Sequence, residues 1–166
     1  MNLLQLVLYI FIPLLAAATP AHAASTSGEI IFPHKGAFIA PGASFKFRYQ
    51  GRADYGVSSY NYTVWLFTSP LKSFTPSEMF ETGYYFGRYS ETNYPANPYP
   101  SNPPPSHLKM PDFSQNPGGF GTGASTSNAH FYLAVFEEYA TGVGSVGYRI
   151  SLAINRITYN GTRPRT

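Results

Sequence analysis

The residues that could carry out acid–base chemistry are few, and their spacing matches no common catalytic set. The eight acids are scattered along the chain, and only Glu137 and Glu138 are adjacent. A glycosidase needs two carboxylates held at a defined separation across a cleft. Neighbours on a strand point to opposite faces, although other pairs of acids could meet in space. We predict that Glu137 and Glu138 are solvated charges at the end of a strand.

Nucleophilic and metal-assisted chemistry lack their usual patterns as well. His34, His107 and His130 do not have the spacing of metal ligands. No Gly-x-Ser-x-Gly sequence marks a hydrolase nucleophile, and the absence of cysteine excludes thiol catalysis. The glycines of 117–123 are not followed by the lysine of a phosphate-binding loop. The sequence therefore predicts a protein that is not an enzyme and has no catalytic, cofactor or metal residues.

A copper enzyme is the one catalytic alternative that we keep open. Secreted copper oxygenases begin with a histidine whose amine and imidazole bind copper together with a second histidine. Cleavage after Ala21 would expose His22 in this way. The small residues Ala21 and Ala23 instead predict cleavage after Ala23, which removes His22.

Residues 1–23 have the pattern of a signal peptide. The charge-free core from Leu3 to Leu15 is shorter than the ~20 residues of a membrane span, and it leads to the small-residue cleavage site. No second apolar segment and no hydrophobic C-terminal tail follow. We expect residues 24–166 to form a single domain that is secreted, extracellular and without a membrane span after cleavage.

The composition indicates a core of aromatic rings and a surface that is polar but weakly charged. The chain has one Trp, 14 Tyr and 13 Phe, and no cysteine. Packing must therefore replace the disulfides on which small secreted proteins often depend. Charged residues make up 11%, and the net charge of +3 is not concentrated in any cluster. A nucleic-acid partner would require such a cluster, so we expect none.

Short alternating segments predict the fold. The aromatic and β-branched run 60–68 carries the strongest strand signal. Segment 44–50 alternates Phe or Tyr with Lys, Arg or Gln, and 129–139 and 146–159 are further strands. Turn residues separate these segments, and no helix is convincing. We predict an all-β fold, an antiparallel immunoglobulin-like β-sandwich of about seven strands with long irregular loops. A barrel is the structural alternative.

The alternation also predicts which side chains are buried. In 146–159 the expected inward residues are Tyr148, Ile150, Leu152 and Ile154, and the expected outward residues are Arg149, Ser151 and Asn155. In 60–68, Asn61, Thr63, Trp65 and Phe67 share one face. A lone Trp is usually well buried, so we predict Trp65 in the core.

Two sequons predict N-glycosylation. They are Asn61-Tyr62-Thr63 and Asn160-Gly161-Thr162, and a chain with a signal peptide passes the enzyme that modifies them. A glycan on Asn61 must face solvent. Because Asn61 and Trp65 share a face, Trp65 would then face outward too, unless the sequon precedes the regular strand or a loop covers Trp65.

The long loops are the predicted contact regions, because loops on a rigid scaffold often carry function. They comprise 69–82, 93–106 and 114–128, with Tyr94, Tyr99 and Phe120 as candidate contact residues. Six of the thirteen residues in 93–105 are proline, so this segment is predicted to be an extended surface crossing. The leading hypothesis is contact with an extracellular or host-surface protein. The alternative is a cell-wall carbohydrate-binding module, in which Tyr84, Tyr85, Tyr94 and Tyr99 would stack on sugar rings.

The opening of the mature chain adds a resemblance to known families. Ile31-Phe-Pro, Gly36 and Pro41-Gly-Ala-Ser-Phe45-Lys-Phe-Arg-Tyr49 resemble the first β-hairpin of small secreted fungal proteins with an immunoglobulin-like sandwich. In length and organisation the chain looks like the necrosis-inducing secreted effector family, whose members act on plant immune receptor kinases. Its opening is also similar to fungal modules associated with cell-wall glucan synthesis. The resemblance implies a fungal effector or wall protein, and it assigns no functional residue.

Overall fold

A computed structural model describes residues 28–54, 57–71, 81–92, 98–115, 126–140 and 148–161. All regular secondary structure in these ranges is β-strand, which confirms the predicted all-β class. Within the same ranges no helix has the length and hydropathy needed to cross a membrane. The predicted signal peptide, 1–23, lies outside the described residues.

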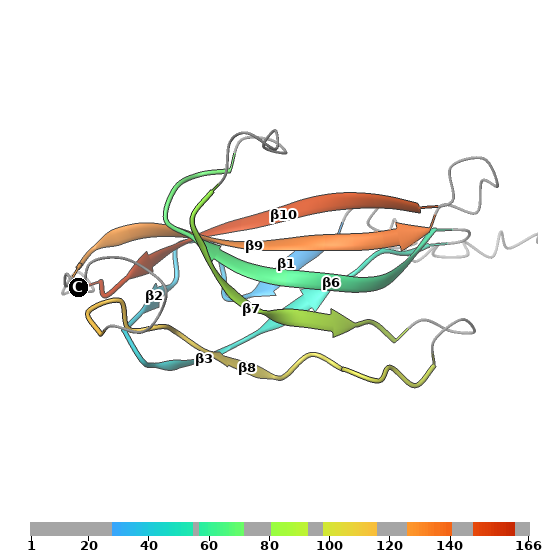
Figure 1. The fold of residues 1–166 in the computed structure, drawn as a ribbon, viewed down its shortest axis with the longest axis horizontal. Helices are drawn as coiled ribbons and strands as arrows, with labels where there is room; N and C mark the ends of the chain where they lie inside the picture. Colours follow the sequence, from blue (N-terminus) through green and yellow to red (C-terminus); the bar gives the residue numbers. More distant parts are fainter. Residues whose placement is uncertain are drawn as a thin grey trace, which may run out of the picture.

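The described residues form ten strands, against a prediction of about seven. They are β1 (Glu29–Phe32), β2 (Phe38–Ile39), β3 (Ser44–Lys46), β4 (Arg48–Gln50), β5 (Ala53–Asp54), β6 (Val57–Phe67), β7 (Gly83–Ser90), β8 (His107–Lys109), β9 (Ala129–Ala140) and β10 (Tyr148–Tyr159). The largest sheet has six strands in the order β2-β10-β9-β6-β5, with β7 also paired to β6. It curls along its length (Figure 1). The pairs β1-β4 and β3-β8 form two small sheets.

Among the described residues, every strand pair is antiparallel except one. β2 runs parallel to the end of β10, with Phe38 opposite Thr158 and Ile39 opposite Tyr159. The prediction of antiparallel pairing is therefore correct for the rest of the fold and wrong for this contact. A tight turn follows β2, in which the Ala43 N–H donates to the Ala40 carbonyl over 3.2 Å. Gly42 lies in this turn with a φ of 69°, a conformation that glycine adopts without steric cost.

The segment predicted as one strand over 44–50 divides at Phe47 and changes partner there. Its first part, β3, pairs with β8, and its second part, β4, pairs with β1. At the division the Phe47 N–H donates to the Ser106 carbonyl over 2.9 Å. The predicted alternation is confirmed, because Phe45, Phe47 and Tyr49 are buried while the residues between them are exposed.

Rings from the small sheets pack against rings of the large sheet. Tyr62 of β6 lies 4.9 Å from Tyr49 and 6.3 Å from Phe47, measured between ring centroids. A second group joins Phe113 to Phe131 and Tyr159, and the Tyr159 hydroxyl accepts the Phe113 N–H over 3.1 Å. Aromatic packing of this kind contributes about 0.5–1.5 kcal/mol per pair beyond the area buried. These contacts fill the core of a chain without cysteine.

The predicted inward face of β10 is wrong. Ile157 and Tyr159 are buried, whereas Tyr148 and Ile150 are 79% and 55% exposed. Asn155, predicted to face solvent, donates its side-chain amide to two backbone carbonyls of the β1 region, at 3.0 Å each. Register explains the inversion. Asn155 and Ile157 are paired with Leu133 and Phe131, whose side chains belong to the core.

The described part of the proline-rich connection, 98–105, contains neither strand nor helix, as predicted. It follows the edge of β7. The Ser90 N–H donates to the Asn102 carbonyl over 2.7 Å, and the Asn102 side-chain amide donates to the Arg88 carbonyl.

Candidate functional site

The side of the six-stranded sheet that faces away from the core, here termed the outer face, is rich in apolar side chains. Register places Trp65, Ala134 and Ile154 in one row across β6, β9 and β10, and Thr63, Phe136 and Leu152 in another. Tyr85 of β7 adjoins Trp65. Three of its large hydrophobic side chains are exposed, namely Tyr85, Tyr148 and Ile150. An apolar face of this kind is a common feature of interaction surfaces.

Trp65 lies on the outer face, so its predicted place in the core is wrong. Its ring is 5.9 Å from that of Phe67, with planes inclined by only 11°, and 4.8 Å from that of Tyr85. The opposite side of β6 fills the core with Tyr62, Val64 and Leu66, which are fully buried. Asn61 and Trp65 therefore share one face of β6, as predicted, and neighbouring rings partly cover the indole.

The first sequon asparagine lies on the same face, near the other end of β6. Asn61 is half-buried and follows a register shift between β6 and β9. It lines a hollow of about 310 Å³ together with Tyr60, Glu138 and Tyr148. The second, Asn160, is exposed, has a φ of 48° and donates its amide to the Thr126 carbonyl over 3.1 Å. Glycosylation at both sites stays a prediction.

The adjacent glutamates behave differently, and the prediction of two solvated charges is correct only for Glu138. Glu138 forms an exposed ion pair with Arg88, with a shortest N–O distance of 2.6 Å. Glu137 is completely buried. Its carboxylate accepts the Arg52 backbone N–H at 2.6 Å, the Arg52 Nε at 3.3 Å and the Ser151 hydroxyl at 3.1 Å. The inward row of β9 could have signalled this burial, because Glu137 follows Leu133 and Val135 at intervals of two.

A second carboxylate, Glu91, lies beside this buried group. A Cβ placed on Gly51 would be 3.0 Å from an oxygen of Glu91 and 3.1 Å from one of Glu137. Burial raises the pKa of Glu91 above its ordinary value of 4.5, and the charge of Glu137 adds to the rise, while backbone hydrogen bonds from Gly51 and Thr92 oppose it. Burial and Glu137 also raise the pKa of the Tyr49 hydroxyl. Glu137 has no exposed surface and Glu91 is half-buried, so the two acids form a largely packed polar cluster.

The raised pKa of Glu91 leads to a prediction on pH. The folded state binds this proton more tightly than the unfolded state, so its contribution to stability is complete below pH 4.5 and is lost as the pH rises through the folded pKa. Glu91→Gln should raise the melting temperature at pH 7 by about 2–4 °C and leave it nearly unchanged at pH 4. Thermal unfolding followed by circular dichroism measures both values. The exposed Glu29→Gln is the control, and an equal response from it would contradict the assignment.

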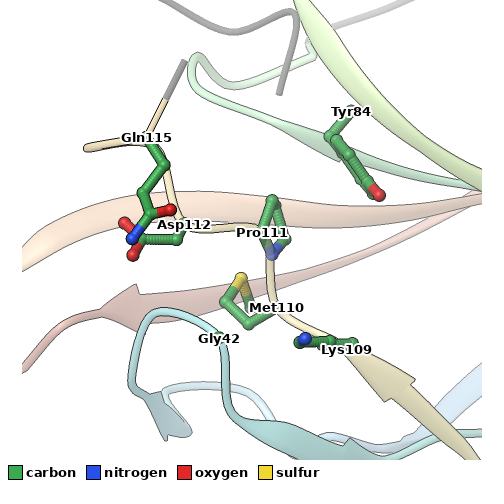
Figure 2. A pocket seen from close by; sticks show the side chains of 7 residues that line it. All are labelled: Gly42, Tyr84, Lys109, Met110, Pro111, Asp112 and Gln115. Carbon is green, nitrogen blue, oxygen red and sulfur yellow. The ribbon is translucent and has the colours of Figure 1, made fainter. Parts of the chain in front are cut away.

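A second hollow, of about 530 Å³, has a mixed polar and apolar lining (Figure 2). Its lining residues are Gly42, Tyr84, Lys109, Met110, Pro111, Asp112 and Gln115. Asp112 and Gln115 lie next to each other, with Tyr84 on the opposite side. One oxygen of Asp112 accepts the Ser114 N–H at 3.0 Å and the Ser114 hydroxyl at 2.6 Å. An aromatic ring facing a carboxylate and an amide suits a small polar ligand.

The other residues predicted for contact or catalysis are not brought together. Tyr99 is 90% exposed, whereas Tyr94, Phe120 and His22 lie outside the described residues. Tyr84 and Tyr85 are neighbours on β7 and point to opposite faces, so they cannot share one flat row of sugar-stacking rings. Across the described ranges, no three His, Asp or Glu side chains are grouped as metal ligands.

The resemblance noted at the opening of the chain concerns β1 to β4 and the turns between them. It implies a fungal secreted protein of immunoglobulin type, and that implication stays a prediction. No protein-family model matches this chain, and no curated protein or solved structure matches it either.

Proposed function

We propose that this chain is a secreted, non-enzymatic β-sandwich that acts by surface contact with a protein partner, as an effector on a host or cell-surface receptor would. One observation carries the proposal: the outer face of the six-stranded sheet exposes Tyr85, Tyr148 and Ile150 although the other side of the sheet is fully packed. Large apolar side chains exposed on one face of a sheet are a common feature of surfaces that another molecule covers.

We propose in addition that the sandwich is of immunoglobulin type. The pairing β1-β4 and β3-β8 corresponds to an A-B-E layer. The order β2-β10-β9-β6-β7, with β2 parallel to β10, corresponds to a layer A′-G-F-C-C′. This strand order supports the assignment, because variable-type domains extend the G-F-C sheet with C′.

The chemistry of the outer face favours a protein over a polysaccharide. Aliphatic Leu152 and Ile154 alternate there with aromatic Trp65 and Phe136 across neighbouring strands. The charges on this face include the Arg88–Glu138 ion pair, in which the two side chains neutralise each other. Protein interfaces are likewise enriched in aromatic residues.

Tyr85→Ser tests the proposed contact face. The protein would be immobilised and exposed to extracellular and host-membrane fractions, and the dissociation constant of the captured partner would be measured for each variant. We expect Tyr85→Ser to weaken binding at least tenfold, since exposed tyrosines at interface centres are frequent hot spots. Tyr99→Ser, in the proline-rich connection, should bind normally. Loss of binding in Tyr99→Ser alone would move the contact to the loops and contradict the proposal.

A cell-wall carbohydrate module is the second candidate, favoured by the hollow of Figure 2, whose lining combines an aromatic ring with polar side chains. Tyr84 would stack on a sugar ring, while Asp112 and Gln115 would bind its hydroxyl groups. Pull-down on chitin, glucan and cellulose tests it. Retention that is lost in Gln115→Ala and kept in Tyr85→Ser would favour this candidate.

A further inference from the structure

We propose that the glycan on Asn61 is part of the folded surface: its first N-acetylglucosamine packs into the hollow lined by Tyr60, Glu138 and Tyr148 and covers that end of the outer face. The inference rests on the secretion that the proposed function includes. It goes beyond that function by assigning a ligand, an attached sugar, to a site formed by named side chains.

The position of the acceptor limits where the first sugar can lie. Asn61 is in the middle of a sheet, with Glu138 of β9 opposite it on one side and Ser90 of β7 on the other. Alternation directs Asn61 and Thr63 to the outer face while Tyr62 is fully buried in the core. A glycan attached here leaves from the surface of a sheet instead of a turn, so its first residue lies against the neighbouring side chains.

Those neighbours form a site suited to a monosaccharide. The hollow holds about 310 Å³, at the small end of the range of about 300–1,000 Å³ for small-molecule sites. The Tyr60 and Tyr148 rings are 5.7 Å apart with planes inclined by 40°, and Tyr148 is 79% exposed. The C–H face of a sugar packs on such rings as other apolar groups do. The Glu138 carboxylate can accept a hydrogen bond from the sugar.

Covalent attachment makes this occupant more favourable than a free ligand. A tethered group binds as an intramolecular event at high effective concentration, so weak ring contacts suffice. The packed sugar would remove Tyr148 from water. Trp65 is four residues further along β6, about 13 Å away at 3.3 Å per residue. The glycan therefore leaves the Trp65 and Tyr85 end of the outer face open for the proposed protein contact.

The test uses the full chain produced by a secreting fungal host, with Thr162→Ala to remove the second sequon. Peptide mass mapping establishes occupancy of Asn61. Melting temperatures are then compared for the complete glycan, for the glycan trimmed to one N-acetylglucosamine, and for Asn61→Gln. The complete and trimmed forms should melt together, and Asn61→Gln should melt about 2–4 °C lower. Asn61→Gln is the reference because enzymatic removal would leave an aspartate next to Glu138.

Tyr148→Ala, combined with Asn61→Gln, completes a double-mutant cycle. In the glycosylated protein it should lower the melting temperature by about the same 2–4 °C. In the Asn61→Gln background its effect should be clearly smaller, because an exposed side chain then loses only its contact with the Tyr60 ring.

Each contrary result has a distinct meaning. A secreted protein with unmodified Asn61, equal melting of the glycosylated and Asn61→Gln proteins, or a Tyr148→Ala effect that does not depend on the glycan would overturn this inference and leave the proposed protein contact standing. A chain that stays unmodified inside the cell would overturn both. Failure of Tyr85→Ser to weaken partner binding would count against the proposed function alone.

Discussion

Glu137→Ala is expected to lower the free energy of unfolding by about 3–5 kcal/mol, whereas Glu138→Ala should lower it by at most about 1 kcal/mol. The carboxylate of Glu137 is completely buried and accepts hydrogen bonds from Arg52 and Ser151. Its removal takes away the acceptor of these hydrogen bonds and leaves a cavity between the sheets. The ion pair of Glu138 is exposed on both sides, so solvent replaces most of what it contributes.

Urea unfolding measures both effects on one scale. The fluorescence of Trp65, the only tryptophan, and far-ultraviolet circular dichroism follow the transition. The two glutamates are neighbours of the same type on one strand, so strand propensity cancels in the comparison. Equal losses for the two variants would show that Glu137 is not held in the buried cluster.

Asn155→Ala is expected to cost about 2–3 kcal/mol, although the sequence pattern predicts an outward, dispensable residue. The amide of Asn155 donates to the carbonyls of Ile30 and Pro33, at 3.0 Å each, and so fixes the β1 region against β10. Each lost bond costs about 1 kcal/mol, and a carbonyl left without a partner adds to this. Asn155→Asp should be more harmful, because it places a carboxylate against two carbonyl oxygens.

Ile150→Asn is the matched control for Asn155. Ile150 is 55% exposed on the outer face, so its replacement should change the free energy of unfolding by no more than about 0.5 kcal/mol. The urea unfolding midpoints of Asn155→Ala, Asn155→Asp and Ile150→Asn measure these differences in stability. A larger loss for Ile150→Asn than for Asn155→Ala would restore the inward face that the sequence pattern predicts.

The alternation in the sequence predicted strand positions better than it predicted which strand face is buried. Over 44–50 the aromatic side chains alternate with Lys, Arg and Gln, and only one assignment of faces is consistent with this pattern. In β10 both faces carry apolar residues, Ile150 and Ile154 on one and Ile157 on the other. The buried face also contains Asn155, whose partners are the carbonyls of Ile30 and Pro33, more than a hundred residues away. No local pattern contains that information.

The same limit applies to the candidate sites. Arg52 and Glu137 are 85 residues apart in the chain, and their contact depends on how β4, β6 and β9 pack. The sequence did place Asn61, Trp65 and Phe67 on one face of a strand. It could not show that this face would be the outer one, because the inward row of Tyr62, Val64 and Leu66 is equally apolar.

The change of partner at Phe47 has a consequence for how the protein loses its structure. The continuous segment 44–50 pairs with β8 and then with β1. Separation of one small sheet from the fold therefore displaces the strand that the other sheet depends on. The two should open as a single cooperative unit. Amide protons in β1 and β8, distant in the chain and in different sheets, would then exchange with deuterium at similar rates.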